Sequence, residues 1–202
     1  VTICDDGVGN FKKIQTALRL LDERHAVLEL AKGKLTTDPA RHSGEGIFFA
    51  SRMFDRFSIR SGSIGFSHRF AKPEDFIVEM QPAVPGTAIV MDLASDTARE
   101  AKSVFDQYAS GEDYGFNKTV VPVSLAQYGD DKLVSRSQAK RLLARIDRFE
   151  TVILDFLNVE SVGQAFADEI FRVFANAHPS IELAEIHANK AVRAMIARAR
   201  AH

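Results

Sequence analysis

The sequence has one cysteine, Cys4, among its 202 residues, and this scarcity excludes two kinds of structure. A single thiol cannot form an internal disulfide framework or a multi-cysteine metal site. Because disulfides belong to oxidising compartments, the lack of them favours a reducing, cytoplasmic setting. We interpret Cys4 as a small buried apolar residue on a central strand.

The chain also lacks a long hydrophobic run and an excess of charge. No apolar stretch approaches the about 20 residues that cross a bilayer, and no secretory signal is visible, so we expect no membrane partner. The 26 basic and 27 acidic residues leave a net charge of −1, which does not favour nucleic acid as a partner. The six histidines are scattered without metal-ligand spacing, so we predict no metal ligands.

What is present is enough apolar sequence for one large or two small domains. We predict a first domain over 1–110, a polar, glycine-bearing linker over 111–118 and a second domain over 119–202. In the first domain, apolar spacing predicts helices near 11–21, 26–31, 47–57 and 95–108, the last capped by Ser95. We expect strands at 1–4, 58–64, 66–70, 75–81 and 87–93, with "PAVPG" as the turn between the last two.

The second domain has a different order of predicted elements, in which strands alternate with helices. Strands are predicted over 119–126, 151–156 and 181–186, and helices over 137–149, 162–176 and 189–200. This alternation is typical of a small parallel α/β sheet. The basic side chains of its first and last helices are interpreted as solvated helix faces.

Two glycine pairs carry the main functional hypothesis. "DDGVGN" places Asp5, Gly7 and Gly9 at the end of a strand, and "HSGEG" places Gly44 and Gly46 where a helix begins. A carboxylate at a strand end can accept a hydrogen bond from an exocyclic amine such as that of adenine. Free amides at a helix start favour phosphate. Between the two pairs runs a polar loop with Lys32 and Lys34, which could close over phosphates.

These motifs, with "PGTAIVMDL", resemble the ATP-binding domain shared by gyrase, the heat-shock chaperone, sensor histidine kinases and MutL, the GHKL superfamily. The resemblance implies a Bergerat-type two-layer α/β sandwich with a mostly antiparallel sheet. It implies that Asp5 holds the adenine amine, that Gly7 and Gly9 form the first glycine box and Gly44 and Gly46 the second, and that residues 31–45 are the ATP lid. Gly86 and Thr87 would be the late Gly-Thr element, with the hydroxyl near adenine.

The sequence departs from this family at its front. Val1 begins directly in a strand-like run, so we interpret the chain as a fragment or as trimmed at its front. The helix that in the family carries an Asn for magnesium and often a Glu for water is not seen. We therefore expect an incomplete nucleotide site. ATP is the cofactor that the resemblance implies, and magnesium is implied only if that helix is present. No catalytic residue can be named.

Ser161 carries a second hypothesis. Ser161 and Gln164 fit the S-x-x-Q capping box, so a helix cap is the structural interpretation. The region 119–200 also resembles STAS domains, in which an Asp-ended strand leads to a Ser-Gly at a helix start. Asp155, Ser161 and Gly163 match that layout, which implies a serine that a partner kinase phosphorylates and a domain that binds a protein partner. The two roles are compatible.

The sequence thus favours a signalling protein in which an ATP-binding, histidine-kinase-like module is coupled to a STAS-like interaction domain. The alternative is a non-catalytic scaffold or transcription-associated regulator with a degenerate nucleotide site. A stand-alone ATPase is a third hypothesis. The oligomeric state is left open.

Overall fold

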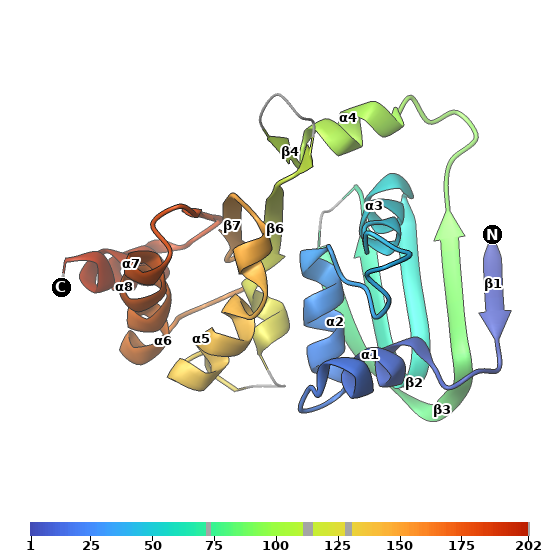
Figure 1. Ribbon diagram of the computed structural model, residues 1–202, viewed down its shortest axis with the longest axis horizontal. Helices are drawn as coiled ribbons and strands as arrows, with labels where there is room; N and C mark the ends of the chain where they lie inside the picture. Colours follow the sequence, from blue (N-terminus) through green and yellow to red (C-terminus); the bar gives the residue numbers. More distant parts are fainter. Residues whose placement is uncertain (72–73, 111–114, 128–130, 202) are drawn as a thin grey trace. The chain divides into compact units, whose positions relative to one another are not determined.

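The chain forms two compact units, residues 1–107 and 108–202, called unit 1 and unit 2 here (Figure 1). The computed structural model describes residues 1–71, 74–110, 115–127 and 131–201. At the predicted linker, β5 (Gly115–Phe116) and the first residue of β6 (Lys118–Pro122) form strands with Asn117 between them, while 111–114 lie outside the described residues. β5 pairs with β4 (Ala109–Ser110) as a short antiparallel ladder in unit 2.

Unit 1 is built on an antiparallel sheet in the order β1–β3–β2. The strands are β1 (Thr2–Asp5), β2 (Arg56–Arg69) and β3 (Glu74–Asp92). Successive side chains of a strand point to opposite faces, and in β2 Phe57 and Ile59 are buried whereas Arg56 and Arg60 are exposed. One face of the sheet therefore carries the core.

The prediction of four strands between 58 and 93 was wrong, because the described residues of that range form two long strands, β2 and β3. "PAVPG" is not a turn but lies inside β3. The ladder between β2 and β3 shifts register at Gly62 of β2, whose φ is 60°. Pro82 and Pro85 of β3 lie opposite this bulge, where their inability to donate hydrogen bonds is tolerated.

Three helices cover the core face of this sheet (Figure 1). They are α1 (Asn10–Leu18), α2 (Glu23–Lys32) and α3 (Gly46–Met53). Their apolar faces form one cluster with β2, which includes Phe11, Ile14, Val27, Leu30, Phe57, Ile59 and Phe66. The helices predicted near 11–21, 26–31 and 47–57 are confirmed with shifted ends.

Two further expectations for unit 1 were wrong. β1 is not buried: all four of its residues, Cys4 included, are exposed, because β1 is an edge strand whose described ladder partner is β3 alone. The helix after β3 does not begin at Ser95. Helix α4 runs over Ala101–Asp106, and Glu100 occupies its N-cap position.

Unit 2 contains a parallel sheet in the order β6–β7–β8, as the alternating pattern predicted. β7 covers Thr151–Asp155 and β8 covers Glu182–Ile186. β6 leads through the 3-10 turns η1 (Val123–Ala126) and η2 (Ile146–Arg148) and helix α5 (Arg136–Leu143) to β7. Its fully buried side chains include Leu142, Leu154, Phe156 and Phe166.

The helix predicted over 162–176 is a continuous helical segment with a π-helical middle. It comprises α6 (Gln164–Asp168), η3 (Glu169–Phe174) and α7 (Ala175–Ala177). The last helix, α8, covers Lys190–Arg200, close to its predicted bounds, and Asn189 caps its first turn by accepting from Val192 N.

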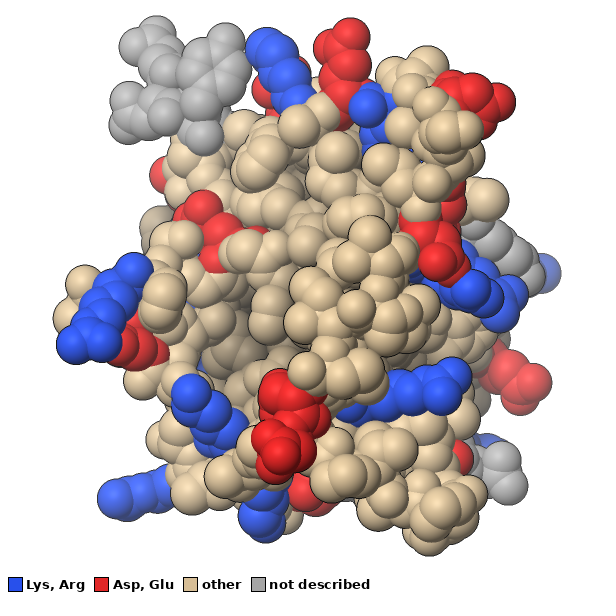
Figure 2. Space-filling view, turned by 90° about the vertical axis from the view of Figure 1, so that its right-hand side faces the viewer, with Lys and Arg blue, Asp and Glu red and all other residues tan. Residues whose placement is uncertain are grey.

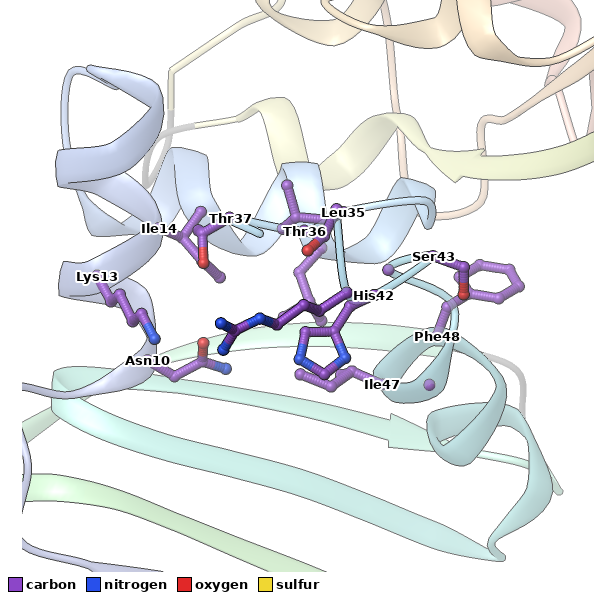
Figure 3. A pocket seen from close by; sticks show the side chains of 14 residues that line it. Asn10, Lys13, Ile14, Leu35, Thr36, Thr37, His42, Ser43, Ile47 and Phe48 are labelled. Carbon is purple, nitrogen blue, oxygen red and sulfur yellow. The ribbon is translucent and has the colours of Figure 1, made fainter. Parts of the chain in front are cut away.

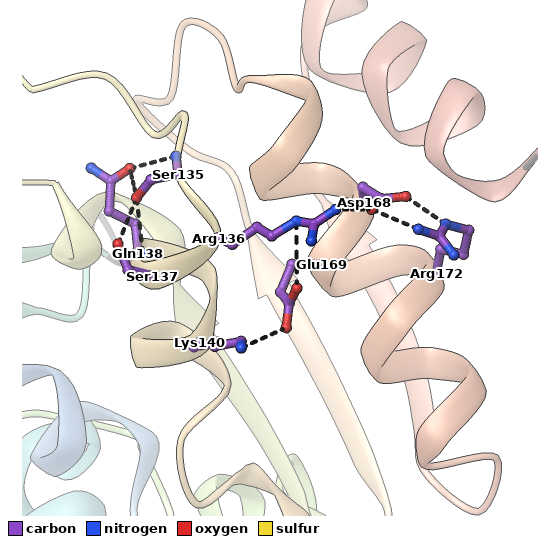
Figure 4. Close-up of polar contacts among 8 residues, drawn as sticks. All are labelled: Ser135, Arg136, Ser137, Gln138, Lys140, Asp168, Glu169 and Arg172. Carbon is purple, nitrogen blue, oxygen red and sulfur yellow. Dashed lines mark hydrogen bonds and ion pairs between the residues drawn. The ribbon is translucent and has the colours of Figure 1, made fainter.

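The capping box predicted at Ser161 is wrong, because α6 begins three residues later and Gly163 occupies its N-cap position. The capping box of unit 2 is at α5 instead. The Ser135 hydroxyl accepts from Gln138 N, and the Gln138 side chain accepts from Ser135 N at 2.9 Å (Figure 4). Sequence spacing alone could not choose between the two, since both segments read S-x-x-Q.

Part of the basic face of α5 is paired rather than simply solvated (Figure 4). Arg136 lies 3.4 Å from Asp168, and Lys140 lies 3.8 Å from Glu169. Arg172 also binds Asp168, at 2.5 Å.

On the side of the chain that Figure 2 shows, acidic and basic side chains are interspersed around a mainly uncharged middle.

The position of the cap yields a matched test. Ser135→Ala should lower the free energy of unfolding by about 1 kcal/mol, because an orphan amide of α5 loses its acceptor. Ser161→Ala should change it by less than about 0.5 kcal/mol, as exposed substitutions do. Urea unfolding of the two variants measures both values, and the opposite ranking would contradict the assignment of the cap.

Candidate functional site

The larger hollow of unit 1 lies where β1 ends and α1 begins. It has a volume of about 810 Å³, and its walls include Asp5, Gly9, Thr87 and Ile89. Asp5 is exposed there. Its Oδ1 accepts from Gly7 N at 2.8 Å, while its Oδ2 has no hydrogen-bond partner among the described residues. The hollow therefore offers one free carboxylate oxygen beside apolar walls.

Close backbone packing holds this end of the sheet. Gly86 has φ 62°, and a Cβ there would overlap the carbonyl oxygen of Asp5. A Cβ on Gly9 would lie 2.5 Å from the Ser61 hydroxyl oxygen. Only glycine permits both approaches. The Thr87 hydroxyl then accepts from Asn10 N at 3.0 Å, which satisfies a free amide at the start of α1.

A smaller hollow of about 560 Å³ lies between α1, the loop after α2 and the start of α3 (Figure 3). Its walls carry the side chains of Lys13, Arg41 and His42 together with Gly44 and Gly46. The two hollows share Asn10, Lys13 and Ile47 on their walls. They are thus neighbours with a common wall, and Asp5 and the second glycine pair face adjoining space.

The loop over the smaller hollow is closed by its own backbone. Leu35 N donates to Gly44 O at 3.1 Å. Gly44 has φ 78°, and a Cβ there would lie 2.5 Å from the carbonyl carbon of Leu35. Residues 35–44 therefore form a loop with joined ends, and we call this segment the lid.

Gly46, the first residue of α3, differs from the other glycines of the site. A Cβ on Gly46 would meet no described heavy atom within 4 Å, and its φ is not positive. The fold therefore does not require glycine at this position. Gly46 also lines the smaller hollow.

The structure brings five of the predicted nucleotide residues onto the two hollows: Asp5, Gly9, Thr87, Gly44 and Gly46. Gly7 and Gly86 do not line either hollow but contact Asp5: Gly7 N donates to its carboxylate, and Gly86 packs closely against its carbonyl oxygen. Lys32 is buried, and its ammonium donates to Glu29 at 2.7 Å, so it does not reach the hollow. Lys34, with φ 51°, lies at the base of the lid outside both walls.

Sequence reasoning did not assign Lys13, Arg41 or His42 to the site. One signal was available for Lys13. Asn10, Lys13 and Ala17 follow helical spacing beside the buried stripe of Phe11 and Ile14, and all three line the larger hollow. Asn10 and Lys13 form a polar face of α1 next to its core stripe, and this face borders the hollow.

A buried cluster fixes the far end of α3. Asp75 binds His68 Nδ1 at 2.8 Å and Arg52 Nη2 at 3.2 Å, and Arg52 also donates to the Ser51 hydroxyl. Burial alone would raise the pKa of Asp75, but the Arg52 guanidinium and the His68 hydrogen bond hold it below its ordinary value. Burial lowers the pKa of His68, against the effect of Asp75.

In unit 2, Ser161 is exposed on the segment that leads into α6. The Asn189 side chain donates to the carbonyls of Val159 and Glu160, so this segment is tied to the start of α8. Asp155 accepts from Leu157 N at 2.9 Å and binds His187 Nδ1 at 2.8 Å. The carboxylate therefore orders the turn after β7.

A family model described as a STAS-like domain of unknown function (DUF4325) matches residues 138–193. Residues 138–193 are STAS-like. The match runs from α5 into α8 and confirms this part of the resemblance, while residues 1–137 lie outside it and the GHKL resemblance stays a prediction. No curated protein and no solved structure matched the chain.

The described residues also bear on metal binding and membrane insertion. They contain no group of three or more His, Cys, Asp or Glu side chains placed to hold a metal ion, so we assign magnesium no ligand among them. No helix within those residues is long and apolar enough to cross a membrane.

The His68 cluster predicts a pH-dependent stability. Unfolded His68 takes up a proton near 6.5, and the folded protein resists this to lower pH, so stability falls as pH decreases through that range. The Asp75 contribution is lost only below the ordinary aspartate pKa of 3.8. Urea unfolding from pH 8 to 5 should show the decline, and His68→Asn should flatten it. An unchanged slope would contradict the assignment.

Proposed function

We propose that unit 1 binds a purine nucleotide, ATP in the first instance, across the two adjoining hollows. The observation that carries this proposal is their common wall: a free carboxylate oxygen of Asp5 faces one hollow, and basic side chains with a glycine-lined helix start face the other. Asp5 Oδ2 is an acceptor suited to the exocyclic amine of adenine. The α3 amides near Gly46 suit phosphate.

The proposal extends to the whole chain as a regulatory protein. Nucleotide occupancy of unit 1 would alter what the STAS-like segment binds, and that partner would be a protein. Support comes from the coexistence of the nucleotide-sized hollow in unit 1 with the STAS-like match in unit 2. The competing proposal is a non-catalytic scaffold, in which the hollows hold no ligand.

Gly46→Ala tests the binding proposal. The added methyl enters open space and meets no described atom, so the free energy of unfolding should stay the same or rise slightly, since Ala favours helix over Gly. The same methyl would occupy the space where phosphate approaches the amides. We expect ATP to raise the melting temperature of the wild-type chain and isothermal titration to show at least tenfold weaker binding by Gly46→Ala.

Ser95→Ala supplies the control, because Ser95 lies outside both hollows and is exposed. It should bind ATP like the wild type. Absence of any ATP-dependent shift or heat in the wild type would favour the scaffold. Unimpaired binding by Gly46→Ala would place the ligand elsewhere.

A second proposal concerns Ser161, whose hydroxyl is exposed and does not cap α6. We propose that it accepts a phosphoryl group from ATP, in cis or from a partner kinase, with loss of the hydroxyl proton and release of ADP. The product would add about two negative charges beside Glu160 and so change the surface that a partner meets.

Phosphopeptide mapping after incubation with ATP and magnesium, alone and with a lysate supplying kinases, tests this step. Label on the peptide that contains Ser161, and its loss in Ser161→Ala, is the expected result. Label on Ser135 or Ser137 but not on Ser161 would refute it, and so would no label at all.

A further inference from the structure

The charged side chains are distributed unequally between the two hollows. The smaller hollow has Lys13, Arg41 and His42 on its wall and no carboxylate among its lining residues. The larger hollow has one carboxylate, Asp5, and one cation, which is again Lys13. Lys13 is therefore the charged side chain common to both, and in Figure 3 it points from α1 toward the cavity.

The ammonium of Lys13 is available for a ligand. It makes no hydrogen bond or ion pair with any described residue, and the residue is exposed. Its neighbour Lys12 is different, because its ammonium donates to Gln15 at 3.0 Å and it lines neither hollow. Two adjacent lysines on one helix thus have the same charge but face different surroundings.

Arg41 offers a second cation from the opposite wall. Its Nε lies 3.7 Å from Asp38, and the side chain is 81% exposed. Exposed pairs of this kind contribute little free energy, so the guanidinium can exchange Asp38 for a stronger anionic partner. Arg–phosphate contacts are charge-assisted and frequently bidentate. Both Asp38 and Arg41 lie on the lid, so such an exchange would draw the lid toward the ligand.

We propose that Lys13 is the residue that selects a nucleoside polyphosphate over a nucleoside, by holding the phosphate chain at the junction of the two hollows, with Arg41 completing the grip from the lid. This inference rests on the proposed nucleotide site and goes beyond it. It assigns phosphate recognition to α1 and the lid, in place of Lys32 and Lys34.

The test compares the affinities of ATP, ADP, AMP and adenosine by isothermal titration for the wild type, Lys13→Gln, Lys12→Gln and Arg41→Gln. The wild type should bind ATP and ADP at least tenfold more tightly than adenosine. Lys13→Gln should weaken ATP about tenfold and leave adenosine within twofold. Lys12→Gln should match the wild type, and Arg41→Gln should weaken ATP less than Lys13→Gln does.

The outcomes separate this inference from the proposal beneath it. If the wild type binds no nucleotide, both fail. If the wild type binds ATP but Lys13→Gln binds it equally well, or weakens ATP and adenosine alike, the role of Lys13 is refuted and the nucleotide site survives. Equal losses in Lys12→Gln and Lys13→Gln would reduce the effect to general charge and also refute it.

Discussion

The site of unit 1 depends on the approach of one backbone to another at Gly86. Any Cβ at this position would occupy the space of the Asp5 carbonyl, so glycine is what allows β3 to lie this close to the end of its neighbour β1. That contact sets where Asp5 leaves the sheet. It also brings Thr87 to the first turn of α1, where its hydroxyl accepts from Asn10 N. The Thr87 contact thus holds the first turn of α1, the helix that carries Lys13. Gly86 and Thr87 thus shape the end of the sheet that borders the larger hollow.

The other wall is positioned by a polar cluster within the core. Arg52, near the end of α3, is held by Asp75 on β3, which also binds His68 on β2. Removal of one partner from a buried ion pair costs several kcal/mol, so the cluster fixes α3 strongly against the sheet. The start of α3, at Gly46, is left open to the hollow. A rigid far end and an exposed first turn are suited to binding an anion. The lid, closed by the Leu35–Gly44 backbone contact, connects this helix to α2.

Much of the fold was predictable because local patterns and packing agree. The parallel sheet of unit 2 follows from alternating strands and helices, and the three helices of unit 1 from their apolar stripes. The errors came where distant contacts decide. The strands predicted on either side of Pro82 and Pro85 form one strand, β3, because the bulge at Gly62 of β2 accommodates the prolines. Cys4 is exposed because β1 is an edge strand. Ser161 lost its capping role because the chain pairs Val162 with Leu133 before the helix begins. The i,i+3 spacing of Glu29 and Lys32 is compatible with an ion pair on a helix, but only the fold shows that α2 buries this pair.

The central claim is that nucleotide occupies the adjoining hollows of unit 1, and amide NMR of the isotopically labelled full chain during titration with ATP tests it most directly. The account predicts saturable shift changes that cluster at residues 5–17, at the lid and at Gly46 and Thr87, with a common affinity. It would be contradicted by an unchanged spectrum at millimolar ATP, or by changes confined to residues 108–202.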